Sequence, residues 1–296
     1  MAERIDPNQV DFSKLSEKEI EKVLSSFSLT DKEYLALDET EFRARFRERL
    51  HHTLEIQTYS AIFAGKKLSG TQTDIVKHLV ELWRQRGLSE ELPDFQTAER
   101  VLGFAARAQK GEQVDLSEYA PHKLTADEYA VYEKVVEQRR SVRHWTEEEV
   151  GDEAIDKILT SGLWAAHSCN LQSIRYAVIR EKNAPGLFKG GDIPGGPVHI
   201  LILQDERVYR ANPFNPVRNR LLDAGAAAQN IVLTAHALGL GGVWLTFTPV
   251  VSERLAGFLQ LPESIKPTTY VDIGWPAQTP ASILRQGLEE AVIKRV

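Results

Sequence analysis

The chain has 296 residues, of which 42% are apolar and 26% charged, and its formal net charge is −6. This composition excludes disorder as the dominant state, because the apolar surface is large enough to offset chain entropy. The acidic balance argues against nucleic acid or an anionic membrane as a partner. We expect a cytoplasmic protein without a membrane span or secretory signal. A single cysteine, Cys169, excludes an internal disulfide and a cysteine metal cluster.

Composition changes near residue 133. Residues 1–133 hold only 3 of the 13 prolines and 5 of the 19 glycines, and their net charge is −7. Residues 134–296 hold the remaining prolines and glycines, with a net charge of +1. Few helix breakers and many charges indicate helices, whereas frequent breakers indicate mixed structure. We therefore predict an all-helical extension over 1–133 and an α+β domain over 134–296.

Helix signals follow one another through the first region. Capping boxes at Ser16–Glu19 and Thr30–Glu33 each predict the start of a helix. A long helix ending near Gly65 is predicted by apolar residues at every fourth position, namely Phe42, Phe46, Leu50 and Leu54. Further apolar stripes, the first of which includes Ile75, predict helices that end near Gly87, Gly111 and Gln138. The last of these begins at a capping box, Thr125–Glu128.

In the second region, helix and strand signals alternate. A capping box at Thr146–Glu149 predicts a helix that continues through Leu159. Short β-branched runs bounded by glycine and proline predict strands over 174–179, 198–203, 243–248 and 268–273. A long helix is predicted over 217–238. Its small residues at 224–228 permit close backbone contact, so this helix is expected to be buried or at a subunit interface.

The densest cationic cluster lies between two predicted helices. Arg139, Arg140 and Arg143 surround Ser141 within five residues. Guanidinium groups match phosphate oxygens in a bidentate fashion, so this pattern suits a phosphate clamp. The alternative is a solvated helix terminus, because cations complement the dipole at a helix C-terminus.

A polar loop over 165–172 is the second candidate for a binding site. Its amide side chains, Asn170 and Gln172, carry both donors and acceptors, which recognition of a heterocycle edge requires. An ordinary turn, in which these side chains cap backbone groups, is the alternative. Residues 239–242, Gly-Leu-Gly-Gly, lack the spacing of a dinucleotide-binding fingerprint and run from helix to strand, the reverse of that motif.

Together these segments resemble the nitroreductase family of FMN-dependent flavoproteins. The resemblance is carried, in the family's order, by residues 139–150, 165–172, 223–245, 272–276 and 284–292. It implies an α+β fold in which helices wrap an antiparallel sheet. It also implies a homodimer with two FMN molecules at the subunit interface. The helical extension resembles no known family.

The resemblance implies a role for each candidate residue. The FMN phosphate would be held by Arg139, Arg140 and Ser141, with Arg285 of the C-terminal tail closing the site. Arg143 would lie over the pyrimidine edge of the flavin. The isoalloxazine ring would be contacted by the side chains of Asn170 and Gln172 and by backbone N–H groups of Thr246 and Phe247.

The implied activity is ping-pong hydride transfer from NAD(P)H through FMN to a nitroaromatic, a quinone or a similar small-molecule acceptor. One alternative is an FMN-dependent dehydrogenase or oxidase of a natural-product or peptide intermediate, and another is a non-catalytic flavin-binding module. No metal site is predicted, since Glu48 and His51 fit a solvated helix face. His167 and Cys169 lie in the polar loop, where structural roles are expected for both.

The connection over 180–197 is short and rich in glycine and proline, which leaves no room for a helix that covers the flavin. We therefore expect some N-terminal helices to pack over the sheet or against a partner subunit near the flavin, where they would exclude water. An independent acidic domain on a tether is the alternative.

Overall fold

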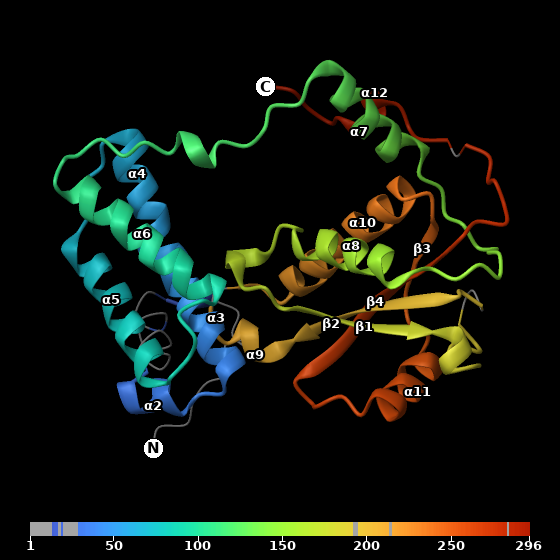
Figure 1. Cartoon of the computed structure of the whole chain (residues 1–296), viewed down its shortest axis with the longest axis horizontal. Coiled ribbons are helices and arrows are strands. Elements are labelled where there is room, and N and C mark those ends of the chain that lie inside the picture. The colour runs from blue at the N-terminus through green and yellow to red at the C-terminus, as the bar shows by residue number, and fades with distance from the viewer. Residues whose placement is uncertain (1–13, 17–18, 20–28, 192–194, 213–214, 283) are drawn as a thin grey trace.

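The computed structural model describes residues 14–16, 19, 29–191, 195–212, 215–282 and 284–296. Figure 1 shows a helical bundle beside a twisted sheet with helices packed against it. The bundle comes from the N-terminal part of the chain and the sheet from the C-terminal part, so the predicted α+β class is confirmed. Within the described ranges, no helix has the combination of length and apolar character needed to cross a bilayer.

The bundle is one continuous series of helices. It comprises α2 (Asp31–Ala36), α3 (Glu39–Arg49), α4 (Ile56–Ala64), α5 (Gly70–Gln85) and α6 (Pro93–Gln109). A π-helical segment, Leu50–Glu55, joins α3 to α4, so the chain stays helical up to Gly65 as predicted. The capping box at Thr30–Glu33 is confirmed. At Ser16–Glu19 the carboxylate accepts both Ser16 donors, but the helix predicted to follow lies outside the described residues.

Aromatic rings form the core of the bundle. The Trp83 ring lies 4.8 Å from Phe46, 6.0 Å from Phe42 and 5.9 Å from Phe95, measured between centroids. All four side chains are buried, and such tilted pairs add to the free energy of burial. The predicted stripe on α3 therefore faces this core. Ile75, which the pattern places on the inner face of α5, is instead exposed.

A segment with one short 3₁₀ turn, Ser117–Tyr119, leads from the bundle to α7 (Ala126–Gln138). The capping box at Thr125–Glu128 is confirmed at the start of α7. This helix contacts α10 (Arg218–Ala237) of the C-terminal part. The change of composition near residue 133 therefore falls inside a helix.

The sheet is antiparallel throughout, in the order β1-β2-β4-β3. Its strands are β1 (Ile174–Arg180), β2 (Val198–Asp205), β3 (Gly241–Leu245) and β4 (Ile265–Gly274). All four predicted strands are confirmed, although β3 ends at Leu245 and leaves Thr246 in a loop. Every residue of β2 is buried, both the apolar run over 200–203 and the polar residues His199, Gln204 and Asp205.

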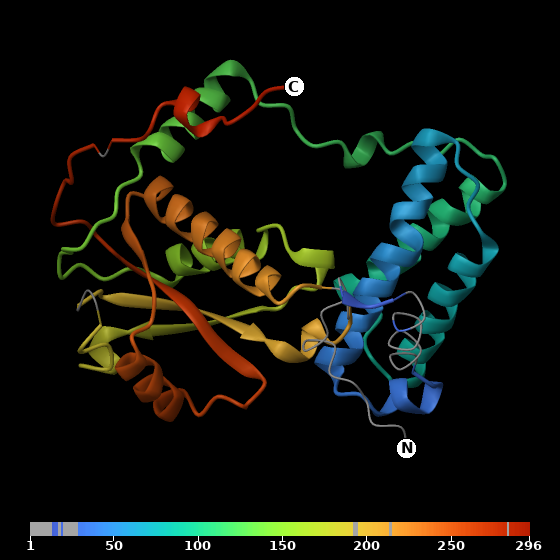
Figure 2. The same cartoon turned by 180° about the vertical axis from the view of Figure 1, so that it is seen from behind.

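Helices cover both faces of the sheet, as the view from behind in Figure 2 shows. On one face, α8 (Asp152–Leu163) and α10 pack on Ile200, Ile202, Val271 and Ile273. On the other, α11 (Pro249–Leu259) packs on Leu201, Leu203, Val243 and Tyr270. The small residues of α10 face its own sheet, since Ala224, Ala227 and Ala228 are all buried in this core. Short helices α9 (Glu206–Tyr209) and α12 (Leu288–Ala291) complete the fold.

The helix predicted to begin at Thr146 is a correction. It begins at Asp152, after Gly151, and no capping box forms at Thr146–Glu149. The Thr146 N–H donates instead to the Trp275 carbonyl at 2.9 Å, and the Glu149 carboxylate pairs with Lys182. Contacts with residues that are distant in the sequence therefore outweigh a local capping signal.

The bundle packs directly against the sheet-bearing part through a small apolar cluster. Ala44 of α3 contacts a group of buried residues from the polar loop and α9, namely Leu171, Val208, Tyr209 and Ala211. Ion pairs flank this cluster, with Arg207 to Asp38 at 3.2 Å and Arg210 to Glu41 at 3.1 Å. The helical extension thus touches the polar loop over 165–172. The only helical structure in the described part of the connection over 180–197 is one 3₁₀ turn.

Candidate functional site

The predicted arginine cluster lies where the chain leaves α7. Ser141 forms a bridge with Gly242, and the Val142 N–H donates to the Gly242 carbonyl at 3.2 Å. Val142 lies directly over Gly241, where an added Cβ would collide with its side chain. Glycine at the start of β3 therefore lets the segment after Arg140 approach the sheet, which holds Arg139 and Arg140 at the end of α10.

The C-terminal tail returns to this cluster. Arg140 donates from Nη2 to the Ser282 hydroxyl at 3.1 Å. Burial lowers the pKa of Arg139, and the charges of Arg285 and Arg140 lower it further. In the described part of the chain, no carboxylate forms an ion pair with any of these three arginines. The tertiary structure thus brings together three like charges, none of which is paired with a carboxylate among the described residues.

His236, near the end of α10, also faces this cluster. Burial lowers the pKa of His236 below its ordinary value of 6.5, and the charges of Arg139 and Arg140 act in the same direction. The sequence did not single out this histidine, because it lies nearly one hundred residues from Arg139. The available signal was a histidine in the last turn of a helix whose C-terminal half is largely apolar.

The pKa of His236 predicts how the cluster responds to pH. The neutral imidazole is favoured in the folded state, so its contribution to stability is present above pH 6.5 and is lost as pH falls through the folded pKa. A bound dianion should raise this pKa, because it stabilises the protonated imidazole. The protein should therefore bind the dianion more tightly as pH falls below about 6.5. Imidazole NMR titrations with and without sulfate, which keeps two charges over this range, measure both effects. An unchanged His236 pKa in saturating sulfate would contradict the prediction.

The polar loop has a constrained backbone. Cys169, Asn170 and Gln172 have φ angles of 53°, 50° and 56°, in the left-handed region that costs energy for residues with a Cβ. Asp223 of α10 holds the loop by accepting hydrogen bonds at 3.0 Å from both the N–H and the hydroxyl of Ser168. The loop is therefore fixed in an unusual shape, which is typical of binding sites.

The amide side chains of the loop are exposed, and Gln172 Nε2 donates to Asn170 Oδ1 at 3.3 Å. The Cys169 thiol accepts a hydrogen bond from Asn212, and burial raises its pKa, which disfavours a reactive thiolate. Nε2 of His167 is buried without a hydrogen-bond partner in the described part of the chain. Asn170 and Gln172 are thus free to meet a ligand, whereas Cys169 is engaged structurally.

Asp223 is a positioning residue that the sequence reasoning missed. It is buried, and its second oxygen accepts a hydrogen bond from Tyr209 at 3.0 Å. The signal was present in the sequence, because an aspartate next to the run of small residues on α10 needs a polar partner once this face is buried.

The remaining candidates lie near β3. Thr246 is exposed directly after the strand, and the Phe247 ring stacks on Tyr270 with centroids 4.8 Å apart. Arg143 is exposed, and its backbone N–H donates to Gln278 Oε1 at 3.2 Å. These contacts place Phe247 on the sheet face opposite α10.

The candidates form two groups at opposite ends of α10. The arginine cluster adjoins His236, and the polar loop is held by Asp223. Thirteen residues of helix separate these two positions, which corresponds to about 20 Å along the axis. Within one chain the predicted phosphate clamp and the amides of the polar loop, Asn170 and Gln172, are therefore not adjacent.

Comparison with known proteins identifies the sheet-bearing part. The model of the nitroreductase family matches residues 136–189 and 186–275. A Methanothermobacter thermautotrophicus protein, a candidate NADH dehydrogenase or NAD(P)H nitroreductase, is 29% identical over 157 residues, which cover 50% of this chain and 79% of that protein. The FMN reductase [NAD(P)H] of Bacillus subtilis is 27% identical, over 50% of this chain and 67% of that enzyme.

A solved structure shows the same relationship. A candidate nitroreductase from Desulfovibrio desulfuricans, determined in complex with FMN, is 32% identical. The match covers 56% of this chain and 96% of that protein, with a TM-score of 0.48. Residues 1–135 lie outside the range that the family model matches.

Proposed function

Since the chain belongs to the nitroreductase family through residues 136–275, we propose that it is an FMN-dependent oxidoreductase. It takes reducing equivalents from NAD(P)H and passes them to a small-molecule acceptor of the nitroaromatic or quinone class. The observation that carries the proposal is the group of Arg139, Arg140 and Arg285, three charges without a carboxylate partner in the described part of the chain.

This cluster fits the phosphate of FMN. A phosphate monoester carries close to two negative charges at neutral pH, and guanidinium groups bind it through charge-assisted hydrogen bonds. Ser141 adds a hydroxyl donor beside the cluster, and its backbone is fixed by the bridge to Gly242. A charged terminus in water would need no such fixed position, so the clamp is the better interpretation.

The flavin supplies the hydride-accepting and electron-donating chemistry when it is bound. The protein's contribution is to bind, to orient and to exclude water. The strained polar loop presents Asn170 and Gln172 as hydrogen-bonding groups for the edge of the ring. Arg143, which is exposed beside the clamp, provides positive charge for a ring that gains negative charge on reduction.

We propose that the complete site forms between two copies of the chain. A twofold dimer that places two α10 helices antiparallel brings the clamp of one subunit beside the polar loop of the other. Leu221 and Leu222 on α10 support this arrangement, because their side chains are 67% and 63% exposed. Leu163 and Trp164 at the end of α8 are also exposed, and α8 contacts α10. Large apolar side chains gathered on one surface are typical of an interface.

The dimer is tested by Leu222→Arg. A charge at this exposed position should leave the subunit folded, separate the dimer and remove FMN together with it. Light scattering and the flavin absorbance of the purified protein measure both outcomes. Ala227→Arg is the contrasting variant, because Ala227 is buried against the sheet and its replacement should unfold the subunit. A Leu222→Arg monomer that still retains FMN would contradict the composite site.

The proposed activity is tested on the purified protein. The expected result is a flavin spectrum, release of FMN by heat as judged by its mass, and oxidation of NADH or NADPH with an added quinone or nitroaromatic compound. A colourless protein that takes up no FMN would overturn the proposal. A yellow protein that leaves NADH and NADPH untouched, but oxidises a substrate with oxygen, would replace the reductase with an oxidase.

A further inference from the structure

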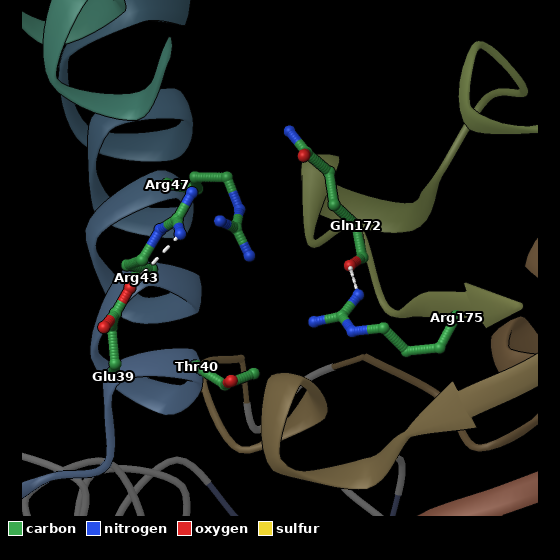
Figure 3. Close-up of a pocket in the computed structure, with 6 residues that line it drawn as sticks. All are labelled: Glu39, Thr40, Arg43, Arg47, Gln172 and Arg175. Carbon is green, nitrogen blue, oxygen red and sulfur yellow. Dashed lines mark hydrogen bonds and ion pairs between the residues drawn. The ribbon is translucent and has the colours of Figure 1, made fainter. Parts of the chain in front are cut away.

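A second cationic site lies between the bundle and the sheet-bearing part, and it is separate from the proposed phosphate clamp. A pocket of about 260 Å³ is lined by residues from α3, from the polar loop and from β1, namely Glu39, Thr40, Arg43, Arg47, Gln172 and Arg175. In Figure 3 the side chains of Arg47 and Arg175 extend from opposite walls toward the space between them. The lining therefore contains three guanidinium groups, those of Arg43, Arg47 and Arg175, but only one carboxylate, that of Glu39.

Arg47 is the most buried of the three arginines. Its side chain is 9% exposed, and it donates to Asp94 Oδ1 at 2.8 Å and to the Leu171 carbonyl at 2.9 Å. Its Nε–H group is buried and has no hydrogen-bond partner in the described part of the chain. The guanidinium group carries five N–H donors, and its terminal nitrogens make one hydrogen bond each, to Asp94 and to Leu171. The second N–H of each terminal nitrogen is therefore available to bind an acceptor.

Arg175 on the opposite wall lacks a close carboxylate. Its guanidinium group donates to the carbonyls of Gln172 and Ile174, and the nearest carboxylate oxygen, on Asp205, lies 3.7 Å away. Asp205 is already bound by Arg207 at 2.7 Å. Burial lowers the pKa of Arg175, as do the charges of Arg47, Arg207 and Arg43, although Asp205 opposes them. Positive charge is therefore in excess around Arg175.

Arg43 and Arg47 share one counter-ion behind the pocket. Asp94, at the start of α6, accepts from Arg43 at 2.5 Å and from Arg47 at 2.8 Å. Glu39 adds an exposed contact to Arg43 at 3.3 Å. Asp94 thus fixes both arginines of α3 beside the pocket, while Arg175 has only a long contact with Asp205, a carboxylate that it shares with Arg207.

We propose that this pocket binds the oxyanion group, carboxylate or phosphate, of a small molecule, with Arg47 and Arg175 as the principal ligands. Planar guanidinium groups on facing walls suit an oxyanion that accepts hydrogen bonds from both sides. The pocket volume of about 260 Å³ leaves room for part of a small molecule beside such a group. An adjoining pocket of about 150 Å³ shares Arg43, Arg47 and Gln172 and is also lined by Asn170. The remainder of the ligand would extend there, beside the polar loop.

The site is assembled from both parts of the chain, since α3 supplies Arg43 and Arg47 and β1 supplies Arg175. The wall formed by α3 lies outside the residues that the family model matches, whereas the opposite wall lies within them. The helical extension therefore contributes ligand selectivity and not only a cover. This inference requires no flavin, so it stands or falls independently of the proposed activity.

The test uses the full chain in an Arg139→Gln background, which weakens the other anion site. Isothermal titration calorimetry with inorganic phosphate and with malonate, run separately, distinguishes the two sources of the oxyanion. Binding of either anion is expected, and adding Arg175→Gln should weaken it about tenfold or more. The matched control adds Arg84→Gln, which removes an exposed arginine of the bundle paired with Glu90 and should leave the affinity unchanged.

Arg175→Lys is a second variant, which keeps the charge but loses the planar fork, and it should also bind more weakly. Thermal unfolding verifies that each variant is folded. Binding of phosphate but not malonate would identify a phosphate ligand, and the reverse result a carboxylate. The proposal is overturned if neither anion binds, or if Arg175→Gln and Arg84→Gln bind equally well. FMN affinity of Arg175→Gln in the wild-type background should be unchanged, which separates this site from the proposed phosphate clamp.

Discussion

Replacing Asp94 with asparagine should lower the free energy of unfolding by about 3–5 kcal/mol. The Asp94 side chain is 5% exposed and is the shared partner of Arg43 and Arg47. Asparagine keeps the shape but removes the charge, so the largely buried Arg47 would remain without compensation. Urea denaturation of the full chain, followed by circular dichroism, measures the change.

The pH dependence of stability provides a second measurement of the same interaction. Burial alone would raise the pKa of Asp94, but Arg47 and Arg43 outweigh it, so the pKa lies below its ordinary value. The contribution of a carboxyl with a lowered pKa is present above the unfolded value and is lost as pH falls through the folded one. The difference in stability between wild type and Asp94→Asn should therefore shrink in acid.

Glu39→Gln is the matched control for Asp94→Asn. Glu39 also pairs with Arg43, but its side chain is 55% exposed, so its loss should cost less than about 0.5 kcal/mol. Equal effects of the two substitutions would show that the ion pairs between α3 and α6 do not stabilise the bundle.

The double substitution Arg139→Gln and Arg285→Gln should weaken FMN binding by about 100-fold or more. Each lost hydrogen bond to a charged phosphate costs about 1.5–3 kcal/mol, and the remaining Arg140 cannot neutralise a dianion alone. Fluorescence quenching of FMN on titration with protein measures the affinity. The weakening should be smaller in high salt, because both arginines are partly in contact with solvent and their charges are screened.

Arg100→Gln is the control for this double variant, because Arg100 is an exposed arginine of α6 whose guanidinium lies over the Tyr119 ring. Its FMN affinity should equal that of the wild type. Wild-type affinity in the double variant would mean that the cluster is an ordinary charged terminus, and the proposed clamp would then be wrong.

Patterns local in the sequence were sufficient for most elements of secondary structure. The stripe over 42–54 predicts a long helix because helical periodicity is set within a few turns. The strands over 174–179 and 198–203 are recognisable because β-branched residues lie between glycine and proline. The motif segments were also sufficient for the family, and hence for the α+β fold that the structure confirms.

Contacts between distant segments were decided only by the tertiary structure. Thr146–Glu149 has the sequence of a capping box, yet pairing with Trp275 and Lys182 moves the helix start to Asp152. The approach of Arg285 to Arg139 depends on the path of the tail, which no periodic pattern encodes and which only the family resemblance implied. Such contacts depend on chain closure over tens to more than one hundred residues, whereas propensity acts over a few.

The two arginine clusters illustrate this difference. Arg139, Arg140 and Arg143 are adjacent in the chain, so the sequence itself determined that positive charge gathers there. Arg47 and Arg175 are 128 positions apart, and each resembles an ordinary surface arginine in its own segment. They share a pocket because burial of Ala44 against Leu171 and Tyr209 brings α3 onto the polar loop. The apolar contact between the two parts of the chain, which no local pattern specifies, therefore decided where the second cationic site forms.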